Sequence, residues 1–174
     1  MMIIWSFGSF AFFLVPYYLQ DIKGANIYDL SLGTEIAEFL ASIICMFISR
    51  IMNLKKALFI FCGLVSWASI GLLIYFFIRG DQEATTTSNL VQAGLIMVCN
   101  LGVVCAFDIA YLINPELFPT MVLATAYGAC NVLGRFISIF SPIVAKIANP
   151  YPLFILIAFS AICSMLTFKL NQIK

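Results

Sequence analysis

The chain has 174 residues, of which 63% are apolar and only 10% are charged. This excludes an ordinary soluble domain, which is about half apolar and carries far more charge. The net charge of +1 and the absence of histidine argue against a nucleic-acid partner and against histidine-based chemistry. We therefore expect an integral membrane protein surrounded by lipid, with no enzymatic activity, cofactor or metal.

Long apolar runs predict membrane-spanning helices, because a helix needs about 20 residues to cross the bilayer. A membrane barrel is disfavoured, since its strands alternate apolar and polar residues over about ten positions, whereas the run 57–78 is apolar on all sides. We expect an all-α membrane domain over residues 1–174. In chain order its six helices are predicted at about 1–20, 30–52, 57–78, 89–113, 118–146 and 153–168.

The connections between these runs carry turn signals. Residues 79–88 form the most polar stretch, and residues 149–152 read Asn-Pro-Tyr-Pro. The triplet Asn114-Pro115-Glu116 is expected to end the fourth helix, because proline cannot donate to the helical ladder. Residues 1–6 lack the basic region of a signal peptide, so a cleaved leader is not expected.

Basic residues predict the orientation in the membrane. Six crossings place both termini on one side, together with the loop that joins the second and third helices. That side carries Arg50, Lys55, Lys56, Lys169 and Lys174, and the opposite side carries Lys23, Arg79 and Lys146. The balance favours both termini inside. It leaves open whether the membrane is the plasma membrane or the mitochondrial inner membrane.

The six cysteines all lie within apolar runs, and no two have the C-x-x-C spacing of a redox or zinc motif. We expect them to be small packing residues and expect no disulfide framework or metal site. They are Cys45, Cys62, Cys99, Cys105, Cys130 and Cys163.

Four charged residues stand out within the predicted spans because they lie away from the basic helix ends: Glu35, Glu38, Asp108 and Arg135. A charge at mid-membrane costs about 3 kcal/mol even on the lenient insertion scale, so each must face a cavity or a partner. Glu35 and Glu38 are three residues apart and share one helix face. In one interpretation these glutamates and Arg135 line a cavity for an organic ion. In the other, Arg135 pairs with a glutamate and only joins two helices, and Asp108, near a helix end, is structural.

The most specific motif is Glu116-Leu-Phe-Pro119-Thr120, followed by Gly128, Arg135, Ser138 and Pro142. It resembles the stretch between the tenth and eleventh helices in the organic ion (cation, anion and carnitine) transporter branch of the major facilitator superfamily. Gly24-Ala-Asn-Ile-Tyr28 and Gly33-Thr-Glu-Ile36 are similar to the loop and early eighth helix of that branch. The resemblance implies helices seven to twelve of such a transporter, built as a 3+3 inverted repeat.

The resemblance also implies roles for single residues. Arg135 matches a cavity position at which arginine accompanies anionic or zwitterionic substrates, and Arg50, Lys55 and Lys56 match a basic loop that latches the inward side. The chain departs from the family pattern in several places. Leu123 replaces an arginine, Ala126 and Ile137 replace glycines, and the basic loop lacks its glycine.

Three functional interpretations follow. The chain is half of a transporter of small organic ions, preferably anionic or zwitterionic, and needs a second six-helix half or a second copy of itself to form a pathway. Alternatively, it is a transport-inactive remnant that serves as a structural subunit of a large membrane complex, such as a mitochondrial respiratory assembly. The third possibility is a fragment of a longer transporter.

Overall fold

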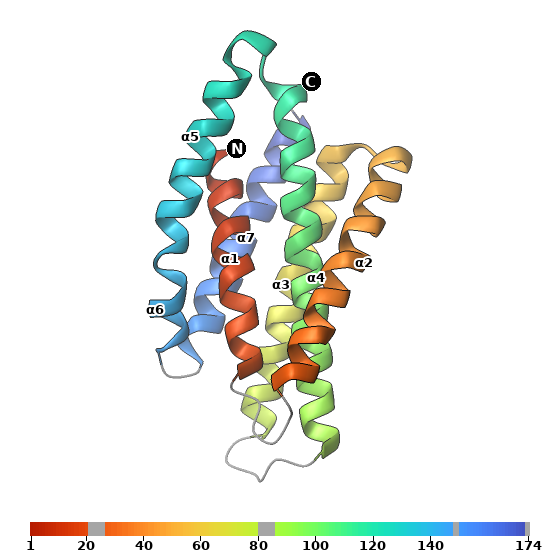
Figure 1. Ribbon diagram of the computed structural model, residues 1–174, viewed down its shortest axis with the longest axis vertical. Helices are drawn as coiled ribbons and strands as arrows, with labels where there is room; N and C mark the ends of the chain where they lie inside the picture. The colour runs from red at the N-terminus through yellow and green to blue at the C-terminus, as the bar shows by residue number, and fades with distance from the viewer. Residues whose placement is uncertain (21–26, 80–85, 148–149, 173–174) are drawn as a thin grey trace.

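The computed structural model describes residues 1–20, 27–79, 86–147 and 150–172 (Figure 1). These residues form helices and short connections and contain no strand, which confirms the predicted all-α fold. Lys23 and Lys174, two of the residues used to predict the orientation, lie outside the described residues. The helices are α1 (Met2–Gln20), α2 (Ile27–Ile51), α3 (Leu54–Arg79), α4 (Thr86–Leu117), α5 (Thr120–Ser138), α6 (Ser141–Ala145) and α7 (Tyr151–Gln172).

Five segments are long and apolar enough to cross a membrane: Ser31–Ile51, Leu54–Ile78, Asn89–Leu117, Thr120–Ala145 and Tyr151–Lys169. The shorter apolar segment Met2–Tyr17 lies in α1. These segments correspond to the six predicted runs, and α5 and α6 together form the fifth. The chain is a multi-pass integral membrane protein.

The helices are arranged in two layers around α1 and α4 (Figure 1). In the layer nearer the viewer, α1 packs against α5 and α6, and α4 packs against α2. In the second layer, α3 packs against α7 and also supports α4 from behind. We call the exposed side of the first layer the front face and the exposed side of α3 and α7 the rear face.

The two central helices run in opposite directions, and each carries one flanking helix of the front layer (Figure 1). Both chain ends lie at the same end of the bundle as the loop between α2 and α3. Arg50 and Lys169 occur in the last turns of α2 and α7, so the described basic residues near the termini gather there as predicted.

Small residues allow the helices to approach closely. A Cβ atom added at Gly134 on α5 would lie 2.7 Å from Ser9 Oγ and 3.0 Å from Trp5 Cδ1 on α1. By contrast, a Cβ at Gly128 would meet nothing within 4 Å. All six cysteines are buried and free, as expected for packing residues.

The fourth helix does not end before Pro115, as the sequence predicts, but continues to Leu117. Proline has no N–H, so the carbonyl of Tyr111, four residues earlier, loses its helical donor. In the structure the hydroxyl of Tyr127 on α5 donates to that carbonyl at 2.6 Å. The side chain therefore replaces the missing backbone bond and lets α4 extend past its proline.

Replacing Tyr127 with phenylalanine is expected to lower the free energy of unfolding by about 0.5–1.5 kcal/mol, because the hydrogen bond to the Tyr111 carbonyl is lost. Thermal unfolding in detergent measures this loss. Tyr151→Phe is the matched control, since Tyr151 is 63% exposed at the start of α7. Equal melting temperatures for the two variants would contradict the assigned role of Tyr127.

The fifth predicted span, 118–146, is interrupted in the structure. It begins at Thr120, after Pro119 as the N-cap, and breaks between α5 and α6 at residues 139–140. Pro142 stands in the first turn of α6, a position where its missing N–H costs little. Ile139 and Phe140 keep right-handed helical backbone angles, so Thr120–Ala145 remains one span despite the interruption.

Candidate functional site

A polar stripe runs along one side of α2. Its members follow one another at helical spacings of four, three, four and seven residues, which keeps them on one face. The opposite exposed side of α2 is apolar, with Ile36, Leu40 and Phe47. The α2 stripe consists of Ser31, Glu35, Glu38, Ser42 and Ser49.

Two members of the α2 stripe are hydrogen-bonded to α4. Glu38 Oε1 accepts a bond of 3.2 Å from Asn100 Nδ2, and Ser42 Oγ donates a bond of 3.2 Å to Asp108 Oδ2. Asn100 is fully buried, whereas Glu38 and Asp108 are half-buried. Asp108 is thus held between two helices, which agrees with the structural role expected for it. The stripe borders the exposed side of α4.

A second polar stripe runs along α5 and consists of Tyr127, Asn131, Arg135 and Ser138, again at helical spacing. Its first member, Tyr127, is bonded to α4 through the Tyr111 carbonyl. The two stripes lie on α2 and α5, the helices on opposite sides of α1 and α4 (Figure 1).

Arg135 is exposed, and its guanidinium carbon lies 5.9 Å from the centroid of the Phe13 ring on α1. Within the described residues, its side chain forms no ion pair with Glu35 or Glu38. Glu35 is likewise exposed and near enough to Glu38 for the two charges to repel. In the structure Glu38 is bonded to Asn100 and Arg135 lies near Phe13. Among the described residues, no ion pair joins the α2 stripe to the stripe on α5 within one chain.

Aromatic rings pack between α1, α4 and α5, toward the end of the bundle that holds the termini. Trp5 contacts Tyr111 at a centroid distance of 4.2 Å and both Phe107 and Tyr127 at 5.7 Å. Tyr111 and Tyr127 are stacked at 6.1 Å. These rings form an apolar and polarizable cluster, which we call the aromatic floor; its Tyr111 ring is exposed, whereas Trp5 is fully buried.

The rear face has a different chemistry. Its exposed side chains in the membrane region are apolar, including Trp67 (76% exposed) on α3 and Met165 (72%) on α7. The described polar side chains that are exposed there lie near the helix ends, at Lys56, Tyr151 and Lys169. The rear face is therefore suited to lipid, whereas the front face exposes charges at a depth where lipid disfavours them.

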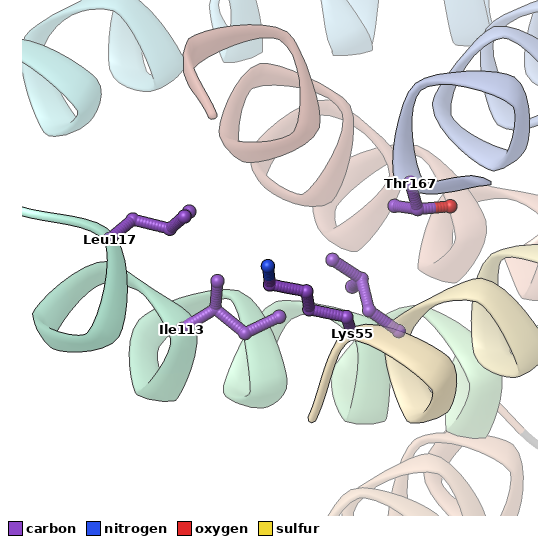
Figure 2. Close-up of a pocket in the computed structure, with 5 residues that line it drawn as sticks. Lys55, Ile113, Leu117 and Thr167 are labelled. Carbon is purple, nitrogen blue, oxygen red and sulfur yellow. The ribbon is translucent and has the colours of Figure 1, made fainter. Parts of the chain in front are cut away.

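The described part of the basic loop has a structural environment of its own. Lys55 lines a hollow at the end of the bundle with Leu58, Ile113, Leu117 and Thr167, and its ammonium group is directed between α4 and α7 (Figure 2). Arg50 and Lys56 are exposed. The hollow is mostly apolar and lies at the membrane edge, so we do not assign the substrate site to it.

The residues of the family motif lie around the turn between α4 and α5 and along α5. Pro119 has a φ of −62° and a ψ of 150°, the extended conformation that precedes a helix. Glu116 and Thr120 are exposed beside it. Gly128 is exposed in open space, and Pro142 begins α6. The motif therefore lies at this turn, along α5 and at the interruption of the fifth span.

Sequence reasoning did not identify Asn100, Ser42 or Tyr127 as parts of the site. Each is a polar residue within an apolar run, and that is the same signal that singled out the four charges. Neutral polar side chains are common at helix packing contacts in membranes, so the signal does not distinguish them without the structure. No group of histidine, cysteine and acidic residues able to hold a metal ion occurs in the described ranges.

No family model matches the chain. It is 29% identical over 130 residues to the transporter candidate svop-1 of Caenorhabditis elegans, an alignment that covers 75% of this chain and 23% of that protein. It is 27% identical over 163 residues to solute carrier family 22 member 6 of Oryctolagus cuniculus, covering 92% of this chain and 27% of that protein. It is 24% identical over 139 residues to solute carrier family 22 member 4 of Mus musculus, covering 80% of this chain and 23% of that protein.

These relatives agree with the predicted resemblance to the organic ion transporter branch of the major facilitator superfamily. Solute carriers are transporters and not enzymes, which agrees with the expectation that the chain has no catalytic role. The chain spans about a quarter of the length of the curated relatives it matches.

Proposed function

We propose that this chain is half of a major-facilitator-type transporter of small organic ions, with a preference for anionic or zwitterionic substrates. The observation that carries the proposal is the asymmetry between its two faces. The front face exposes Glu35 and Arg135 within the membrane region, and the rear face exposes apolar side chains there. A face of this kind is stable only against water or protein.

Transporters of this class bind substrate near the bilayer midplane, between two six-helix halves. On that basis the front face is one wall of a pathway, and a second half supplies the other wall. Arg135 is proposed to bind a substrate carboxylate, because its planar guanidinium matches that group with two parallel hydrogen bonds. Glu38 is proposed to bind the cationic part of a zwitterion, and the exposed Tyr111 ring of the aromatic floor its apolar body.

Uptake into liposomes that contain the purified chain tests this proposal. The probes are an anion that does not cross lipid by itself, 4-sulfobenzoate, and a cation of similar size, phenyltrimethylammonium. Uptake of the anion above protein-free liposomes, and above uptake of the cation, is the expected result. No uptake of either ion, in preparations shown to be folded and assembled, would overturn the proposal and favour a structural role in a larger membrane complex.

A further inference from the structure

We infer that the second half is another copy of this chain, related to the first by a twofold axis along the membrane normal, and that Glu35 of each copy pairs with Arg135 of the other. The inference rests on the proposed function for the requirement that a second half covers the front face. Beyond that function, the second copy is the chain that covers the front face, and the Glu35–Arg135 ion pair is the contact between the copies.

The two groups lie at the same depth. Glu35 is eight residues from the start of α2, which is roughly 12 Å along the helix at 1.5 Å per residue. Arg135 is ten residues from the end of α6, which is roughly 15 Å by the same rule. The start of α2 and the end of α6 lie at the same end of the bundle, opposite the termini (Figure 1). The two side chains therefore occupy nearly the same level in the membrane.

The arrangement of the helices brings the two groups together across a twofold axis. The flanks of the front layer are α2 on one side and α5 on the other, with α1 and α4 between them (Figure 1). Two copies inserted in the same orientation face each other through an axis along the membrane normal. This rotation exchanges the flanks, so that α2 of one copy meets α5 of the other, and the contact occurs twice.

The charges are complementary across this contact. One flank carries acidic Glu35, and the other carries basic Arg135. Glu38 and Asp108 already accept hydrogen bonds from Asn100 and Ser42. Among the described residues, the side chains of Glu35 and Arg135 have neither a hydrogen bond nor an ion pair, although both are charged within the span. The second copy supplies to each of them a side chain of opposite charge.

Pairing with Glu35 is compatible with substrate binding by Arg135. A guanidinium group has five N–H donors, so one edge is able to hold the partner's Glu35 while another binds a substrate carboxylate. The ion pair then lies at the rim of the pathway and keeps Arg135 oriented toward it.

Charge reversal in two differently tagged copies tests the pairing. Glu35→Arg alone places two arginines in contact at each site, and Arg135→Glu alone places two glutamates in contact. We expect each variant to lose self-association on the order of tenfold or more, since like charges in an interface cost several kcal/mol. When the two variants are co-expressed, every contact again joins an arginine to a glutamate. Their mixed pair is therefore expected to associate as the original chain does.

The mixture separates loss of pairing from loss of folding, because two misfolded chains do not rescue each other. Lys169→Glu, which makes the same charge change as Arg135→Glu but at the exposed end of α7, is the matched control and is expected to leave association unchanged. Failure of the mixture to restore association would overturn the inference. It would also be overturned by an original chain that is monomeric in lipid nanodiscs or bound to a different six-helix chain. Failure of the mixture, or a different six-helix partner, leaves the proposed transport function to be judged by uptake, whereas a monomer contradicts that function as well.

Discussion

Replacing Arg135 with alanine is expected to lower the uptake of an organic anion by roughly 10- to 100-fold. A hydrogen bond to a charged group contributes about 1.5–3 kcal/mol, and about 1.4 kcal/mol corresponds to a tenfold change. The loss is expected in the apparent affinity for the anion, because Arg135 is proposed to bind substrate and not to drive a later step. Initial rates of 4-sulfobenzoate uptake over a range of concentrations measure it.

Two controls show whether the effect belongs to substrate binding. Arg135→Lys keeps the charge but loses the planar pair of donors, so its uptake is expected to fall between the original chain and Arg135→Ala. Self-association is measured on the same samples, so that uptake is compared at equal amounts of assembled protein. Arg135→Ala with unchanged anion affinity would contradict the assignment of Arg135 to the substrate site.

Replacing Gly134 with leucine is expected to lower the free energy of unfolding by about 1–3 kcal/mol or more, as overpacking of a tight contact does. A Cβ at this position already lies 2.7 Å from Ser9 Oγ and 3.0 Å from Trp5 Cδ1. A larger side chain therefore pushes α5 away from α1 and disturbs the aromatic floor. The six buried cysteines provide the measurement, since a thiol-reactive dye reports their exposure as the protein unfolds on heating.

Gly128→Leu is the matched control for Gly134→Leu. It makes the same change six residues earlier on the same helix, where an added Cβ meets nothing within 4 Å. This control is expected to keep or slightly raise the melting temperature, because leucine favours a helix more than glycine does. If the two leucine variants melt at the same temperature, the close packing of α1 on α5 does not contribute to stability as proposed.

The sequence predicts the fold well because lipid restricts the possible structures. An apolar run of about 20 residues has one stable form in a bilayer, so the segments around residues 57–78 and 153–168 are predicted without any knowledge of packing. Helix ends are predicted less well. The end of α4 depends on a hydrogen bond from Tyr127, which lies on another helix. The sequence around Pro115 alone therefore does not predict where α4 ends.

The candidate site is predicted in part. The cost of a charge in lipid identifies Glu35, Glu38, Asp108 and Arg135 from their positions alone. Their partners depend on how the helices rotate against one another. A direct pair between Arg135 and a glutamate was one sequence-based interpretation, yet within the described chain Glu38 is bonded to Asn100 and Arg135 lies over Phe13. The sequence thus predicts the four charged residues, but it does not predict that buried Asn100 is hydrogen-bonded to Glu38.

The central claim is that the front face is one wall of a transport pathway and is covered by a second six-helix half. Extraction in a gentle detergent, followed by native mass spectrometry of everything that remains bound, tests it most directly. The account predicts a species of twelve helices, with the second copy of this chain as its other half. A stable single copy, or a large assembly of many unrelated membrane subunits, would contradict it.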